Sequence, residues 1–189
     1  NPPVVKKIMP HKIEFKKKKG GYAVWLEPNE IKKLISVTDT IDEQIVLTLL
    51  SRGLRCAEAC RADSSQLFRD SRGLMLEVVG KNALRREVPV PDTLEMVNFP
   101  IIRRGTPIST NTALAWVKKA GKKIGIPEIS PHDLRRSFCQ NALRAGIPSE
   151  MVRAWSGHQS QTNFERYYLS TSDLSWQSQE REKLEKFLF

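Results

Sequence analysis

Apolar side chains recur at helical spacing along much of the chain. In the segment 27–37, Ile31, Leu34 and Ile35 form a stripe, and Pro28 suits the first turn of a helix. Similar patterns, several of them closed by a glycine, predict further helices. These helices are expected over 40–53, 56–67, 111–125, 130–146, 148–157 and 175–189.

The period changes in the middle of the chain. The apolar segments "GLMLEVV" (73–79) and "REVPV" (86–90) flank the polar turn "GKNALR". This arrangement predicts a β-hairpin, alone or as part of a small sheet. The fold class expected from the whole pattern is α+β, mostly α-helical with a small antiparallel β-sheet.

Residues 1–22 follow neither period, and they contain prolines and end in "KKKKGG". We interpret them as a basic linker or arm, in which Lys16, Lys17, Lys18 and Lys19 would contact phosphates. A solvated tether explains the same composition equally well. Because the chain starts without an initiator Met or an apolar signal core, we expect it to be cut from a longer protein.

The charge balance favours a polyanionic partner. The 31 Lys and Arg against 21 Asp and Glu give a net charge of +10, although a well-solvated surface could also carry this excess. Nucleic acid is the first candidate and an anionic membrane surface the second. The longest apolar run, "IVLTLL", is far too short to span a bilayer.

The cysteines predict neither a disulfide framework nor a metal site. There are three of them, an odd number, which favours a reducing compartment. Cys56 and Cys60 would share one face of a helix, but no further ligands stand at zinc-site spacing, so we expect small buried apolar residues. The sequence points to no cofactor and no metal.

Two clusters of candidate residues fall in the first half of the chain. Arg55 and Glu58 are three positions apart, so Glu58 could hold the guanidinium of Arg55 toward a phosphate. For this cluster taken alone, a surface ion pair is the simpler interpretation. Lys81 stands at the predicted hairpin tip, where it could enter a DNA groove and donate a proton, or simply face solvent.

Two further clusters follow. His132 and Arg135 stand at a predicted helix start, where both could face one anion, although a capping histidine beside an exposed arginine is the simpler interpretation. The stretch "SGHQSQTNFERYYLS" places His158 nine positions before Tyr167, with Tyr168 beside it.

Taken in order, these residues resemble the tyrosine recombinase (phage-integrase) family. That family has G-x-R-x-x-E, G-K, H-x-x-R and G-H motifs and a tyrosine nine residues after the last histidine. Here the motifs are Gly53-Leu54-Arg55 with Glu58, Gly80-Lys81, His132 with Arg135, and Gly157-His158 with Tyr167. The resemblance covers residues 24–170, and the set is far more specific than any single motif.

The resemblance implies a catalytic role for six residues and a supporting role for Glu58. Tyr167 would attack the scissile phosphate of DNA and form a 3′-phosphotyrosyl bond. Two arginines and a histidine, Arg55, Arg135 and His158, would neutralise the charge of the transition state. His132 would act as general base and Lys81 as general acid. On a helix, neighbouring residues point about 100° apart, so only one of the two tyrosines can face the phosphate.

The resemblance also implies the organisation and partners. Residues 23–170 would be the catalytic domain, 1–22 the linker from an N-terminal DNA-binding domain, and 171–189 a helical tail that docks on a neighbouring protomer or folds back. We expect a cytoplasmic, nucleoid-associated protein that binds double-stranded DNA as a homo-oligomer, a tetramer, without a membrane. Additional backbone contacts are expected from Lys118, Lys119, Lys122 and Lys123.

Three alternatives stay open on the sequence alone. A type IB topoisomerase uses similar phosphotyrosine chemistry to relax supercoils. A DNA-binding module could keep the fold without catalysis, although none of the six expected positions is substituted. A basic structural protein could carry the motifs by accident.

Overall fold

The computed structural model describes residues 11–14, 22–80, 83–162 and 164. The six α-helices of this part confirm the helices predicted there, except that the helix predicted over 56–67 ends early. The helix predicted over 175–189 lies outside the described residues. The bounds of the six helices are α1 Pro28–Ser36, α2 Ile41–Ser51, α3 Cys56–Arg61, α4 Thr110–Lys123, α5 Pro131–Arg144 and α6 Ser149–Ser156. The fold is therefore mostly α-helical, as expected.

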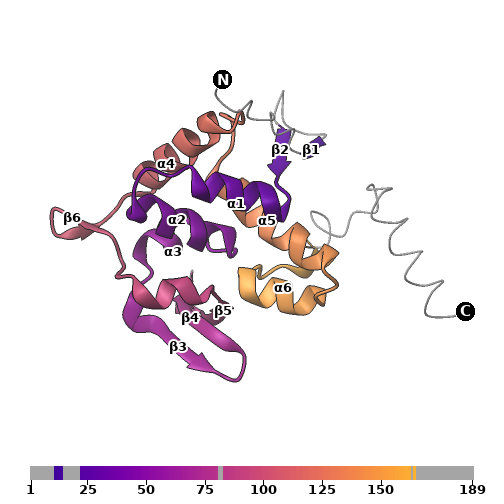
Figure 1. The fold of residues 1–189 in the computed structure, drawn as a ribbon. Helices are drawn as coiled ribbons and strands as arrows, with labels where there is room; N and C mark the ends of the chain where they lie inside the picture. The colour runs from indigo at the N-terminus through magenta and orange to yellow at the C-terminus, as the bar shows by residue number, and fades with distance from the viewer. Residues whose placement is uncertain (1–10, 15–21, 81–82, 163, 165–189) are drawn as a thin grey trace, which may run out of the picture.

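Helix α2 forms the centre of the helical layer (Figure 1). Ile45, Val46, Leu47, Leu49 and Leu50 are all buried, so apolar side chains surround most of its circumference. Only a narrower face, with the exposed Gln44 and the partly buried Thr48 and Ser51, is left for solvent. The wide apolar face is stable only when other parts of the protein cover it. Accordingly α1, α3, α4 and α5 all pack against it.

The predicted hairpin is confirmed and belongs to a three-stranded antiparallel sheet on one side of the helices (Figure 1). Strand β4 (Gly73–Val79) lies between β3 (Leu67–Asp70) and β5 (Arg85–Pro89). Helix α6 contacts β5, which brings the end of the hairpin close to the C-terminal helices.

The prediction of one helix over 56–67 is wrong after Arg61. Ala62 has an extended backbone, with φ −55° and ψ 139°. The Asp63 carboxylate then accepts a hydrogen bond from Ser65 N–H and starts a separate 3-10 turn at Ser64–Gln66. A capping side chain thus competes successfully with continuation of the helix.

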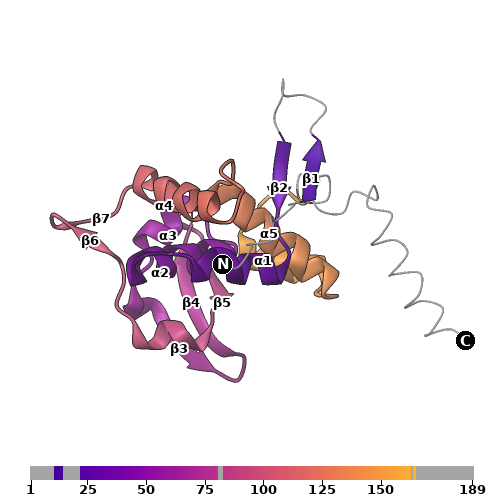
Figure 2. The same cartoon turned by 45° about the horizontal axis from the view of Figure 1, so that its top comes forward.

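A short strand lies within the segment that the sequence suggested was aperiodic. β1 (His11–Glu14) pairs antiparallel with β2 (Tyr22–Trp25), and Figure 2 shows this pair standing away from the helices. The base of β2 is attached to α5, because Leu26 N–H donates to Ser137 Oγ at 2.8 Å and Asn141 Nδ2 donates to Leu26 O at 2.9 Å. That residues 1–22 serve as a linker stays a prediction.

The remaining elements connect the sheet to α4. They are a 3-10 turn at Asp92–Met96 and the two-residue strands β6 (Ile102–Arg103) and β7 (Thr106–Pro107). Within the described ranges, no helix combines the length and apolar character that crossing a bilayer requires.

Candidate active site

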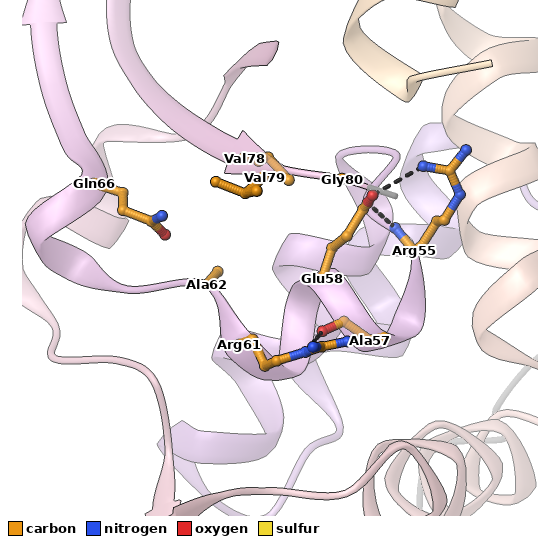
Figure 3. Close-up of a pocket in the computed structure, with 9 residues that line it drawn as sticks. All are labelled: Arg55, Ala57, Glu58, Arg61, Ala62, Gln66, Val78, Val79 and Gly80. Carbon is orange, nitrogen blue, oxygen red and sulfur yellow. Dashed lines mark hydrogen bonds and ion pairs between the residues drawn. The ribbon is translucent and has the colours of Figure 1, made fainter. Parts of the chain in front are cut away.

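Arg55 lies at the start of α3, where Glu58 holds it in place. The Arg55 backbone N–H donates to Glu58 Oε2 at 2.7 Å, and Arg55 Nη1 donates to Glu58 Oε1 at 2.9 Å. Figure 3 shows the two side chains turned toward each other beside Gly80. The Arg55 side chain is still 40% exposed, so its guanidinium remains accessible to a ligand.

Arg135 comes from the second turn of α5 and is only 3% exposed. Its Nη1 donates to the carbonyl oxygen of Gly53 at 2.6 Å, which fixes the guanidinium over the loop between α2 and α3. Gly53 has φ +87°, and a Cβ there would lie 2.6 Å from the Phe138 ring. Glycine is therefore required at position 53, because the backbone has a positive φ and because Phe138 leaves no space for a side chain. The same backbone conformation presents the carbonyl oxygen that Arg135 binds.

His158 follows α6 and joins the two arginines. Arg135 Nη2 lies 3.3 Å from each ring nitrogen of His158, and Arg55 Nη2 donates to the carbonyl oxygen of Gly157 at 2.6 Å. The ring is also tilted against Phe164, with centroids 5.4 Å apart. Arg55, Arg135 and His158, three predicted catalytic residues spread over more than a hundred positions of the sequence, thus converge at one point.

Burial and nearby cations disfavour a charged imidazole here. Burial, then the positive charges of Arg135 and Arg55, with smaller effects from His132 and Arg86, lower the pKa of His158 to about 3. The ring is consequently neutral near pH 7 in the ligand-free protein. So many positive groups around one histidine are what an anion-binding site requires.

His132 is exposed at the start of α5 and faces the same space. A cavity of about 370 Å³ is lined by Arg55, His132, Arg135 and His158, together with Leu54, Cys56 and Pro131. Four of the predicted site residues therefore border one opening. Ser130 caps the N-terminus of α5, because its N–H and its Oγ both donate to Asp133 Oδ2 in the first turn. This cap fixes the start of the helix that carries His132 and Arg135.

Arg86 is a site residue that we missed in the sequence. It lies on β5 with a side chain 11% exposed, and its guanidinium donates to both carboxylate oxygens of Glu58, at 3.0 and 2.6 Å. Its Nε also donates to the carbonyl oxygen of Trp155 at 2.8 Å. Arg86 therefore joins the hairpin, α3 and the end of α6, and so supports both Arg55 and His158.

Sterics explain why a glycine precedes His158. Gly157 has φ +69°, and a Cβ there would approach Arg86 Nε to 3.0 Å. A larger residue would strain the backbone and displace Arg86. The period of two along β5 could have revealed this arginine, because Arg86 and the buried Val88 must point to the same face of the strand.

Glu58 is the shared anion of this network, with a side chain 6% exposed. Burial would raise the pKa of its carboxyl, but hydrogen bonds from Arg86 and from Arg55, with the charge of Arg86, outweigh burial and lower the pKa to about 2. A folded-state pKa below the usual value of 4.5 means that the ionised carboxylate stabilises the fold above that pH. This contribution is lost as the pH falls toward 2.

We therefore predict that Glu58→Gln lowers the free energy of unfolding by about 3 kcal/mol at pH 7, because two arginines lose their shared charge. Urea unfolding at several pH values should show this difference shrinking between pH 4.5 and 2. The matched control is Glu87→Gln, which breaks an exposed ion pair with Arg72 and should change little. A Glu58→Gln deficit that is independent of pH would contradict the assignment.

Six of the predicted residues lie outside the described part of the chain. They are Lys81, Tyr167, Lys16, Lys17, Lys18 and Lys19. The hairpin nevertheless brings Gly80, the neighbour of Lys81, to the site, because Gly80 lines one cavity with Arg55, Arg86 and His158. The roles of Lys81 and Tyr167 stay predictions.

The four lysines of α4 are exposed but differ in their partners. Lys119 contacts Asp39 and Glu43 at 2.7 and 2.8 Å, and Lys123 pairs with Asp39. These ion pairs tie α4 to the start of α2 and lower the pKa of Asp39 to about 2. They weaken the case for Lys119 and Lys123 as phosphate contacts and leave Lys118 and Lys122 as the better candidates.

The three cysteines are free, and Cys60 and Cys139 are buried, as expected for apolar roles, while Cys56 is only partly buried. The described part of the chain contains no group of three or more His, Cys, Asp or Glu side chains that could hold a metal ion.

Comparisons with known proteins identify the family of this chain. The model of the phage integrase family matches residues 94–173. The tyrosine recombinase XerA of Thermococcus kodakarensis is 30% identical over 178 residues, covering 84% of this chain and 62% of the relative. XerA of Pyrococcus furiosus is 31% identical over 180 residues, with the same coverages of 84% and 62%. The chain thus spans less than two thirds of the length of these relatives.

Solved structures share the fold. A crystal structure of XerA recombinase superimposes with a TM-score of 0.70 at 20% identity, covering 85% of this chain and 64% of that one. XerH recombinase bound to its difH substrate gives a TM-score of 0.65 at 14% identity, covering 76% and 49%. The chain therefore belongs to the tyrosine recombinase (phage integrase) family and contains the fold of its catalytic domain.

Proposed function

We propose that the chain is the catalytic part of a site-specific DNA recombinase that cuts and rejoins strands through a covalent 3′-phosphotyrosyl intermediate. The observation that carries this proposal is the convergence of Arg55, Arg135 and His158 on one opening, with His132 at its border. The relatives are named tyrosine recombinases, and several structural neighbours are complexes with DNA.

The chemistry follows from the charges. Attack on a phosphodiester adds negative charge to its non-bridging oxygens, and preorganised donors around one phosphate stabilise that charge. Arg55 and Arg135 supply fixed guanidinium groups. The hydroxyl of Tyr167 has an ordinary pKa of about 10, so it needs a base, for which His132 is the candidate.

Attack by Tyr167 exchanges one phosphoester bond for another, so the energy of the broken DNA linkage is conserved. The Tyr167 oxygen bonds to phosphorus, the bond to the 5′ oxygen breaks, and Lys81 gives that oxygen a proton. A 5′-hydroxyl from a second strand then reverses the reaction and releases the tyrosine, giving strand exchange. We propose that this occurs in a homo-oligomer, a tetramer, on double-stranded DNA, in a cytoplasmic, nucleoid-associated protein.

The direct test is a nicked suicide duplex, from which the short 5′-hydroxyl fragment escapes after cleavage. We expect a covalent adduct that survives denaturant and forms in EDTA, because side-chain cations surround the phosphate. A protein that spans the whole length of the relatives should be run beside this chain, since the additional length can supply affinity. Failure of both proteins to form an adduct on a cognate site, or strict dependence on a divalent ion, would contradict the proposal.

DNA affinity provides a second test, at α4. Replacing Lys118 and Lys122 together by glutamine should weaken DNA binding and lower the slope of log K against log salt by about 2, because two phosphate contacts are lost. The matched control replaces Lys119 and Lys123, which should change the slope less because ion pairs already engage them. Equal salt slopes for the two double variants would contradict the distinction.

A further inference from the structure

Ser156, the last residue of α6, lies next to His158, the histidine of the site. Its side chain is fully buried. The hydroxyl oxygen lies 2.8 Å from Nδ1 of His158 and 2.6 Å from the carbonyl oxygen of Val152. A second carbonyl oxygen, that of Arg153, lies 3.3 Å away.

The partners of this hydroxyl determine where its single proton goes. A carbonyl oxygen can only accept, so the contact of 2.6 Å requires Ser156 to donate to Val152. The hydroxyl then offers only a lone pair to the ring, and Nδ1 of His158 must carry a hydrogen to donate across 2.8 Å. In a neutral imidazole this leaves Nε2 without one.

We infer that Ser156 is a positioning residue that holds His158 in the Nδ1–H tautomer, so that Nε2 meets the scissile phosphate and must bind a proton to donate to it. The inference about the tautomer stands on the geometry of α6 alone. Its consequence for cleavage rests on the proposed function.

The charges around His158 make the protonation of its ring depend on whether a phosphate is bound. The charged or titratable groups that act on the ring are Arg55 at the start of α3, Arg86 on β5, and His132 and Arg135 on α5. All are cationic or can become so, and together with burial they keep the free ring neutral. A bound phosphate adds the opposing negative charge, so we expect the ring to take up a proton from solvent as DNA binds.

The tautomer can be measured without DNA. In protein labelled with ¹⁵N-histidine, His11→Gln and His132→Gln variants identify the signals of His158 by elimination. We expect the wild-type ring to show protonated Nδ1 and unprotonated Nε2. In Ser156→Ala the Nε2–H tautomer should become populated, and Ser156→Thr, which keeps a hydroxyl, should restore the wild-type pattern. If the variants fail to fold, the wild-type spectrum decides alone: an Nε2–H ring would overturn the inference.

The effect on cleavage should depend on pH. At low pH the ring is charged in both proteins, and Ser156→Ala should cleave ~10-fold more slowly because a charged N–H loses its acceptor. At high pH the ring is neutral, and in the Ser156→Ala variant its single hydrogen can lie on Nε2 and reach the phosphate. In the wild type, Ser156 keeps that hydrogen on Nδ1, so the neutral wild-type ring cannot donate. The ratio of wild-type to variant rate should therefore fall as pH rises.

A ratio that does not change with pH would overturn the inference. Absence of a covalent adduct in every protein would contradict the proposed function and leave the tautomer measured by NMR unaffected.

Discussion

Replacing Tyr167 by phenylalanine is expected to abolish the covalent protein–DNA adduct, while Tyr168→Phe should retain it. The interval of nine residues from His158 selects Tyr167, and neighbouring residues on a helix point about 100° apart. Phenylalanine removes only the nucleophilic oxygen, so the variant should still bind DNA. The measurement is the fraction of suicide duplex that migrates with denatured protein.

The Tyr168→Phe variant is the matched control, because it makes the same chemical change one position away. An adduct that persists in Tyr167→Phe and disappears in Tyr168→Phe would move the nucleophile by one residue. An adduct that persists in both would exclude the tyrosine pair altogether.

Arg135→Lys is expected to slow cleavage by about 10²–10³-fold, the effect of removing one oxyanion donor. The guanidinium uses Nη1 to hold Gly53 O while Nη2 lies beside His158, and a single ammonium cannot do both. Single-turnover cleavage at saturating protein separates this loss from weaker binding.

Arg136→Lys is the control for Arg135→Lys. Arg136 is a neighbouring buried arginine of α5, whose Nη1 pairs with Asp133 at 2.6 Å. Its replacement should reduce stability while leaving the cleavage rate of the folded protein nearly unchanged. Equal losses of rate in the two variants would indicate that Arg135 acts through the folding of α5 and not through the phosphate.

Much of the fold could be predicted from the sequence, because helices and strands leave different periods. The stripe of Ile31, Leu34 and Ile35 and the change of period at 73–90 both led to the observed elements. The end of α3 was missed because a capping interaction of Asp63 is local and leaves no period. Strands of four residues, such as β1 and β3, are too short for alternation to identify them.

The candidate site was predictable as a set of residues but not as a network. Arg55, His132, Arg135 and His158 were identified by motif spacing, and the fold brings them to one cavity. Arg86 and Ser156 belong to no such motif, because their importance comes from contacts across the fold. Arg86 meets Glu58 over 28 positions, and the role of Ser156 depends on a carbonyl oxygen of its own helix.

Hydrogen bonds to Glu58 and to backbone carbonyl oxygens also explain how three arginines can lie close together in one site. Glu58 is the buried anion that Arg55 and Arg86 share, and each of Arg55, Arg86 and Arg135 also donates a hydrogen bond to a backbone carbonyl oxygen. Carbonyl dipoles orient the guanidinium groups without neutralising them. The site therefore keeps an excess of positive charge for an anionic ligand.

The central claim is that Arg55, Arg135 and His158 act on one phosphate. A crystal structure of the full-length Tyr167→Phe protein on uncleaved DNA would test it most directly. We expect nitrogen atoms of both guanidinium groups and Nε2 of His158 within about 3 Å of the non-bridging oxygens of the scissile phosphate. Contacts from these three side chains to different phosphates, or a scissile phosphate bound elsewhere, would contradict it.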